Sequence, residues 1–318
     1  MGYLLLILLI LTGSGCSATT PGLTRVGASQ PPEVSLAPVP WEADPAISTF
    51  AKQATNHQHT REDRVRSLVE AIYNKFEFST SYDAHLTLTA QDVFRLGRGN
   101  CFSFTNLLVA ASREVGIHAF YLDASRGRST LHELEGQLVH SGHIVAGVVL
   151  DDLSVMVVDF AQLSRPEVLN YRAITDEDTY ALFLNTLGWD IYRQGGDALP
   201  WFQAATRISP MMESPWNNLA ALLIQQGQIA DAELILRQAT RGRSQSFAPW
   251  YNLGLIYLKQ GDYVRAEDAF EHAYIRKHDS AVVVYQLGLA YQYQGKGTRA
   301  GWAFHRARHL GHPRREGG

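Results

Sequence analysis

The carboxyl-terminal half of the chain repeats itself every 34 residues. Trp216, Trp250 and Val284 are spaced at this interval, and further columns of leucine, glycine and alanine keep the same spacing. Those columns are Leu219, Leu253 and Leu287; Gly227, Gly261 and Gly295; Ala232, Ala266 and Ala300. A unit of this length is a helix pair that buries its apolar face only against neighbouring units. The repeat therefore predicts an all-α solenoid over residues 179–312.

This pattern resembles the tetratricopeptide repeat family, and the run from Trp250 to Tyr257 matches the first helix of that family. About four repeats are expected, and a first repeat near Leu182 to Pro210 is expected to cap the array. Solenoids of this class offer a concave surface to peptides or protein partners.

Polar and phenolic side chains lie beside the packing columns in the first helices, the side that usually lines the concave face in this family. They are Asn218, Tyr251, Asn252, Tyr285 and Gln286. We expect these groups to bind a protein partner by pairing with the main chain of an extended segment. The alternative is that they are only solvated polar positions.

In the amino-terminal half, Cys101 opens a run with the pattern of a helix. From Phe102 to Val115 the apolar residues recur at steps of three and four, and Gly116 lies where a helix stop belongs. A helix N-terminus carries roughly half a positive charge, which favours the thiolate form of a cysteine. The sequence predicts a nucleophile at Cys101, and the alternative is a small buried cysteine on the same helix.

Two later residues complete a nucleophile site. His143 opens the apolar run Ile144–Leu150, and Asp159 closes Val155–Val158. A cysteine, a histidine that takes its proton and an acid that orients the histidine form the general arrangement of an activated nucleophile. Because strand side chains alternate between faces, His143 and Asp159 meet only across a hairpin loop with an odd number of residues or a bulge. We expect such a loop near Asp152.

The cysteine, the histidine and the aspartate each lie in a short motif that resembles the transglutaminase-like superfamily of papain-fold cysteine enzymes. The motifs are Gly99-Asn100-Cys101 before a helix ending in Val115-Gly116-Ile117, Gly142-His143 entering a strand, and Val158-Asp159. The resemblance covers roughly residues 46–175. It implies an α+β papain-like domain, assigned to residues 46–178, with helices packed on one side of an antiparallel sheet. The polar stretch Asp123 to Gly136 is expected to be a loop.

The resemblance implies that Cys101, His143 and Asp159 are catalytic. Cys101 is then expected to attack a peptide or carboxamide carbonyl, and water or an amine resolves the thioester. The outcome is a cysteine protease or amidase in the first case and a transamidase in the second. The backbone N–H of Cys101 is expected to stabilise the oxyanion, and Asn100 is the candidate for a second donor.

The extreme amino terminus has the pattern of an export signal. Leu4 to Leu11 is an apolar octet, too short to span a bilayer, and a buried strand is the alternative interpretation. The small residues leading to Cys16 resemble the bacterial lipoprotein signal. They imply that residues 1–16 end in a lipidated Cys16, that residues 17–45 are a flexible tether, and that the protein lies on the periplasmic face of the outer membrane.

Composition limits the remaining functions. Residues 1–178 hold 13 Lys and Arg against 20 Asp and Glu, whereas residues 179–318 hold 15 against 11, which indicates two units with different surfaces. A nucleic-acid partner is not expected, because it usually requires a stronger basic footprint. No metal or cofactor is expected, since His57, His59, His132 and His140 lack the spacing of a metal site.

The sequence thus predicts a membrane-anchored thiol enzyme whose repeats bind a protein partner or substrate. The alternative is a non-catalytic periplasmic scaffold lipoprotein in which the repeats mediate protein–protein interaction.

Overall fold

The computed structural model describes residues 7–9, 38–77, 81–124, 131–134, 136–140, 143–160, 171–240 and 246–312. The chain divides into two compact units. The first comprises Met1–Arg128 and His143–Phe183, and the second comprises Ser129–Gly142 and Leu184–Gly318. Cys16 and the predicted tether up to residue 37 lie outside the described residues.

The first unit is built on a five-stranded sheet with the order β1-β6-β5-β2-β7, in which every neighbouring pair is antiparallel. The strands are β1 (Ile7–Leu9), β2 (Ala119–Asp123), β5 (Ile144–Val149), β6 (Val155–Val158) and β7 (Arg172–Ile174). The apolar octet, expected as part of an export signal, contributes the short edge strand β1 here.

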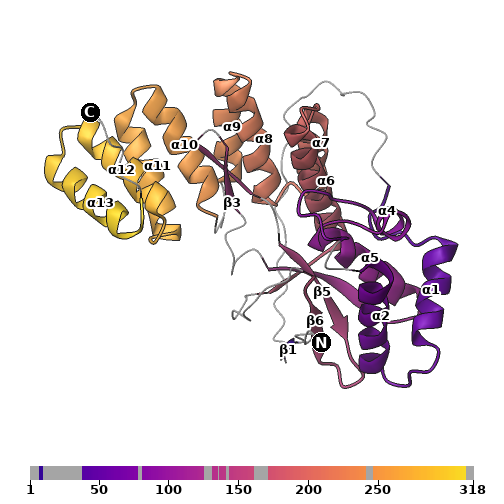
Figure 1. Ribbon diagram of the computed structural model, residues 1–318. Coiled ribbons are helices and arrows are strands. Elements are labelled where there is room, and N and C mark those ends of the chain that lie inside the picture. The colour runs from indigo at the N-terminus through magenta and orange to yellow at the C-terminus, as the bar shows by residue number, and fades with distance from the viewer. Residues whose placement is uncertain are drawn as a thin grey trace, which may run out of the picture. The chain divides into compact units, whose positions relative to one another are not determined.

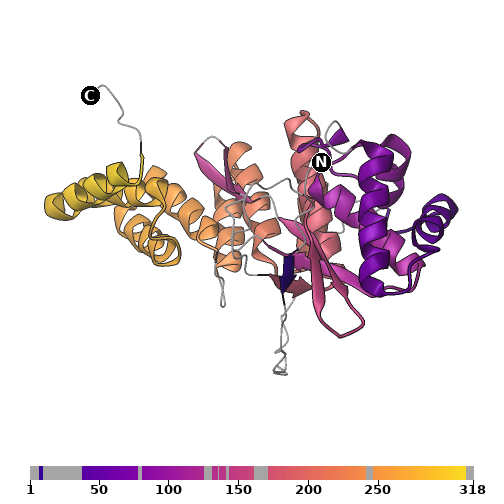
Figure 2. The same cartoon turned by 60° about the horizontal axis from the view of Figure 1, so that its bottom comes forward.

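The helices of the first unit centre on the cysteine-bearing helix α5 (Figures 1 and 2). They are α1 (Pro45–Thr55), α2 (Arg61–Phe76), α4 (Ala90–Leu96) and α5 (Cys101–Glu114). Helix α5 contacts β5 and β2, and the other three pack against α5. It is buried on all sides from Phe102 to Ser112, whereas the sequence predicted one buried face. Several of its buried polar groups are hydrogen-bonded; for example, the Asn106 amide donates to the Leu88 carbonyl at 3.1 Å.

Eight helices of the described residues form four consecutive pairs. They are α6 (Asp176–Arg193), α7 (Leu199–Ile208), α8 (Glu213–Gln225), α9 (Ile229–Ala239), α10 (Ala248–Lys259), α11 (Tyr263–Arg276), α12 (Ala281–Tyr293) and α13 (Gly297–His309). The leucine and alanine columns are buried in the core of the solenoid, whereas the glycine column lies in turns with positive φ. At Gly254, a Cβ atom would lie 2.5 Å from the Phe270 ring, so only glycine allows α10 and α11 to approach this closely. The boundary between the units falls inside α6, between Phe183 and Leu184, rather than at the predicted 178/179.

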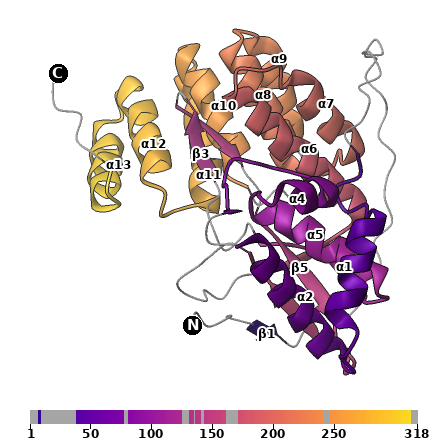
Figure 3. The same ribbon diagram turned by 45° about the vertical axis from the view of Figure 1, so that its right-hand side comes forward.

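Part of the predicted papain-like domain groups with the repeats instead. Strands β3 (Leu131–Leu134) and β4 (Gln137–His140) form a separate two-stranded hairpin, and β4 contacts α8 and α10 (Figure 3). Leu131–Leu134 is a strand inside the predicted loop Asp123–Gly136, and Ser129–Gly142 group with the second unit although they lie within the predicted domain 46–178. The physical reason is that the partners of β4 lie far along the chain, so local sequence carries no signal for this pairing.

Candidate active site

Cys101 is the first residue of α5 and is half-buried. Asn100 is the N-cap of the helix, and its Oδ1 accepts a hydrogen bond from the Ser103 N–H at 2.9 Å. The Asn100 amide nitrogen donates to the Thr87 hydroxyl at 2.8 Å. These contacts hold the helix start and place the Cys101 sulfur at the positive end of the helix. They give Asn100 a capping role, and its oxyanion role stays a prediction.

His143 and Asp159 lie on neighbouring strands and meet on one face of the sheet. The Leu150 N–H donates to the Ser154 carbonyl at 2.8 Å, which leaves a loop of three residues, the odd number that the alternation requires. Ala146 pairs with Val158, so Asp159 comes opposite the residue two places after His143. The His143 Nε2 lies 2.9 Å from Asp159 Oδ2, as expected from the loop.

The His143 imidazole also hydrogen-bonds the Cys101 side chain. His143 is only 5% exposed, and this burial lowers the pKa of the imidazole. The hydrogen bonds and charges of Asp159 and Cys101 outweigh burial and raise the pKa of His143 to about 10. At neutral pH the imidazole is therefore protonated, which is the state that pairs with a thiolate.

Tyr82 belongs to the same cluster and was not found from the sequence. Its hydroxyl contacts Cys101 twice, through the side chain and through the backbone N–H. A β-bridge between Tyr82 and Gly99 fixes this position, with the Asp83 N–H donating to the Gly99 carbonyl at 2.9 Å. Burial and the nearby Cys101 raise the pKa of Tyr82, so its hydroxyl keeps its proton and can act as a donor. No motif in the sequence signals this contact.

The structure places the five predicted partner-binding residues of the repeats in different surroundings. Asn252 is fully buried and bonds the backbone of Leu138 in β4. Asn218 donates to Asn185 at 3.0 Å. Tyr251 is a core residue, packed on Phe270 with ring centroids 5.8 Å apart, because its side chain turns into the solenoid.

The other two predicted partner-binding residues lie one repeat further on. The Tyr285 ring stacks on His312 at 4.0 Å. The side-chain oxygen of Gln286 is buried without a hydrogen-bond partner among the described residues.

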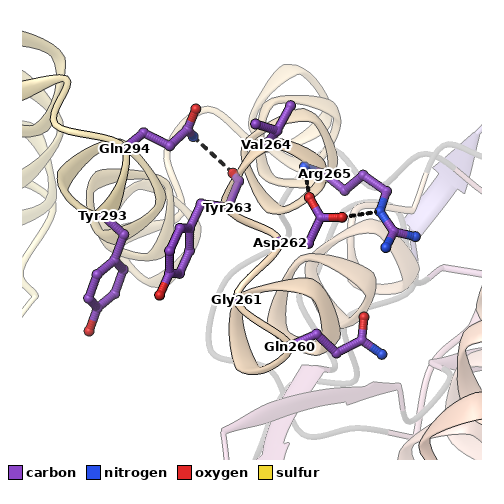
Figure 4. Close-up of a pocket in the computed structure, with 8 residues that line it drawn as sticks. All are labelled: Gln260, Gly261, Asp262, Tyr263, Val264, Arg265, Tyr293 and Gln294. Carbon is purple, nitrogen blue, oxygen red and sulfur yellow. Dashed lines mark hydrogen bonds and ion pairs between the residues drawn. The ribbon is translucent and has the colours of Figure 1, made fainter.

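A cavity of about 470 Å³ lies among the repeats, lined by Gln260–Arg265, Tyr293 and Gln294 (Figure 4). The Tyr263 and Tyr293 rings stack there at 4.9 Å, and the Asp262 carboxylate pairs with Arg265 at 2.6 Å. Its lining contains no cysteine or histidine, so it does not offer the chemistry found around Cys101.

The described part of the chain holds no group of three or more His, Cys, Asp or Glu side chains gathered as metal ligands. Within the same residues, no helix has both the length and the apolar composition needed to cross a bilayer.

A cysteine at the start of a buried helix, facing a histidine and an aspartate from an antiparallel sheet, defines a papain-like cysteine domain. The comparisons agree with this class. The transglutaminase-like superfamily model matches residues 48–160, a range that includes all three residues. Two tetratricopeptide repeat models match residues 217–247 and 247–277. The chain therefore carries a transglutaminase-like core domain followed by tetratricopeptide repeats.

No curated protein matches the chain. Among solved structures, the crystal structure of MamA has 21% identity and a TM-score of 0.38, covering 41% of this chain and 77% of that one. MamA residues 41 to the end from Desulfovibrio magneticus RS-1 has 22% identity and a TM-score of 0.38, covering 44% and 78%. The Cut9–Hcn1 hetero-tetramer of APC/C has 17% identity and a TM-score of 0.37, covering 41% and 25%. Likeness at this level says nothing about function.

Proposed function

We propose that the chain is a membrane-anchored thiol enzyme that acts on peptide or carboxamide bonds through Cys101, His143 and Asp159, and that its repeats bind a protein partner or substrate. The observation that carries the proposal is the position of the His143 imidazole. It hydrogen-bonds the Cys101 side chain and lies 2.9 Å from the Asp159 carboxylate. An acid, an imidazole and a thiol in this order form the relay that activates cysteine nucleophiles.

In the proposed reaction the Cys101 sulfur attacks the carbonyl carbon, a C–S bond forms, and the carbonyl oxygen becomes negatively charged. The backbone N–H of Cys101 and the Tyr82 hydroxyl are the donors for this charge. His143 then gives its proton to the amine as the C–N bond breaks, which leaves a thioester. Water or a second amine attacks the thioester, His143 takes its proton, and the sulfur of Cys101 leaves.

The anchor in this proposal is lipid on Cys16, on the periplasmic face of the outer membrane. Several acyl chains hold a protein firmly, because each buried CH₂ contributes about 0.8 kcal/mol. Repeats of the tetratricopeptide class bind proteins through their concave face.

Labelling with a peptide acyloxymethyl ketone, which alkylates activated cysteines, tests the catalytic part. We expect the wild type to be labelled, Cys101→Ala to stay unlabelled, and His143→Ala to react at least about 100-fold more slowly, since it lacks the proton relay. His118→Ala is the matched control, because His118 packs on Phe120 rather than on the thiol. Equal labelling rates for His143→Ala and the wild type would contradict the relay.

A further inference from the structure

The first helices α8 and α10 of two neighbouring repeats form a face, here called the repeat groove, that is already occupied by strand β4 of the same chain. The Asn252 side chain pairs with both main-chain groups of one residue in β4: its Oδ1 accepts from the Leu138 N–H at 3.0 Å, and its Nδ2 donates to the Leu138 carbonyl at 2.8 Å. A neighbouring β-strand satisfies a residue in the same way. The side chain of Asn252 therefore takes the place of a strand partner.

A second asparagine from the preceding repeat reinforces this pairing. The Asn217 amide donates to the same Leu138 carbonyl at 2.7 Å, and Asn252 donates to Asn217 Oδ1 at 2.9 Å. Both side chains are buried, with Asn217 1% and Asn252 0% exposed, so their amides hydrogen-bond within the protein and not with water. Removing either one leaves buried main-chain groups unpaired, which is costly.

The side chains of β4 add a limited amount of selectivity. Leu138 belongs to the hydrophobic core of the solenoid, and Gln137 accepts a hydrogen bond from Gln225 at 3.0 Å. Beside Gln137 lies a cavity of about 190 Å³, lined mostly by aliphatic side chains such as Ile224 and Leu255. The strand that occupies the groove thus leaves apolar space unfilled next to it.

Two observations indicate that β4 can be exchanged for another strand. The hairpin β3–β4 is a two-stranded sheet of its own, so its place on the repeats depends on its contacts with α8 and α10 and not on a larger sheet. Gln286 occupies the column of Asn252 one repeat further on, and its buried Oε1 lacks a partner among the described residues.

We infer that the repeat groove binds extended protein strands through their main-chain groups and that β4 is its resident ligand. A partner strand with an aliphatic residue at the Leu138 position exchanges with β4. The inference rests on the binding role that the proposed function gives the repeats. It does not depend on catalysis by Cys101. An incoming strand must compete with a tethered ligand, whose effective concentration is about millimolar.

A labelled peptide with the sequence of residues 134–140 is the probe, and fluorescence anisotropy measures its binding to the full chain. All variants carry Cys101→Ala, so that the thiol cannot process the peptide. Leu138→Pro opens the groove, because proline lacks the N–H that donates to Asn252. We expect it to bind the peptide at least tenfold more tightly than the chain with the intact hairpin.

Adding Asn252→Ala to Leu138→Pro is expected to weaken peptide binding by roughly tenfold or more, since a buried paired amide is lost. The control is Gln294→Ala, which removes a repeat amide that donates to Glu267 at 2.6 Å, and it is expected to change binding less than threefold. Equal peptide affinity with and without Asn252→Ala, or no gain from Leu138→Pro in a chain that keeps its helical circular dichroism, overturns the inference.

Hydrogen exchange tests the same inference in a chain with an intact hairpin, in case Leu138→Pro unfolds the repeats. Asn252→Ala should speed exchange of the Leu138 amide about tenfold, and saturating peptide should also speed exchange of β4 as the hairpin leaves the groove. Unchanged exchange of β4 under saturating peptide overturns the inference. Failure of the thiol labelling, with these results intact, would instead reject the catalytic part alone.

Discussion

The substitution Asp159→Asn should lower the pKa of His143, because it removes the negative charge from the carboxyl position 2.9 Å from Nε2. A hydrogen bond to a charged group contributes about 1.5–3 kcal/mol, which corresponds to about one to two pKa units at 1.36 kcal/mol per unit. The wild-type pKa of about 10 is sustained by this bond against the burial of the ring. We therefore expect the pKa of His143 to fall by about one to two units in Asp159→Asn.

Imidazole resonances in a ¹H–¹⁵N spectrum report this titration directly. Asp151→Asn is the matched control, because Asp151 is an exposed carboxylate paired with Arg61 at 3.3 Å, and its loss should leave the titration of His143 unchanged. The reasoning fails if His143 of the wild type titrates near 6.5, or if the titration is the same in Asp159→Asn and the wild type.

The pairing of His143 with Asp159 also makes the free energy of unfolding depend on pH. The pKa of His143 is raised from 6.5 to about 10, so its contribution is fully present below about pH 6.5 and is lost as pH rises through about 10. The free energy of unfolding should therefore fall more between pH 6 and pH 10 in the wild type than in Asp159→Asn. Urea unfolding at the two pH values measures this difference, and parallel losses in both proteins would contradict it.

Three further changes test other parts of the molecule. Tyr82→Phe should slow thiol labelling by about 10- to 150-fold, since it removes a hydroxyl donor worth about 1.5–3 kcal/mol to a charged group, and an unchanged rate would exclude that role. Gly254→Ala should destabilise the repeats by about 1–3 kcal/mol in urea unfolding, because its Cβ meets Phe270, whereas Gly301→Ala, with open space around it, should not destabilise them. Cys16→Ser should move the protein from the membrane pellet to the soluble fraction, and persistence in the pellet after a high-salt wash would refute the lipid anchor.

The sequence predicted the core of the candidate site because each of its three residues has a local signal. Cys101 precedes a run with helical periodicity, and Gly116 marks the end of that helix. His143 and Asp159 bound two apolar strands, and the parity of the loop between them is a local property. Because the loop between these two strands is short, the sequence pattern was enough to predict that His143 and Asp159 lie on one face of the sheet. The catalytic roles of the three residues stay predictions until the thiol is tested.

Tyr82 could not be predicted in the same way. Its place beside Cys101 depends on one β-bridge to Gly99, outside any regular strand, so neither periodicity nor a cap marks it. The burial of α5 on all sides was also hidden, since its hydroxyl and amide side chains have the sequence pattern of an exposed face. The structure shows the reason for this burial: Ser103 and Asn106 hydrogen-bond the main-chain N–H and carbonyl of Leu88, which packs over α5.

The repeats show where sequence reasoning about binding reaches its limit. The 34-residue period located the first helices and indicated that amides such as Asn252 pair with an extended main chain. It could not identify the occupant, because the N–H and C=O groups that Asn252 bonds are common to almost every residue. Leu138 is 114 positions away from Asn252, so no local pattern links them. Leu138 and the preceding Gln137 of β4 are weak sequence features that many segments share. A groove that binds the main chain selects little by sequence, so the strand with the highest local concentration occupies it. In this protein that strand is β4 of the same chain.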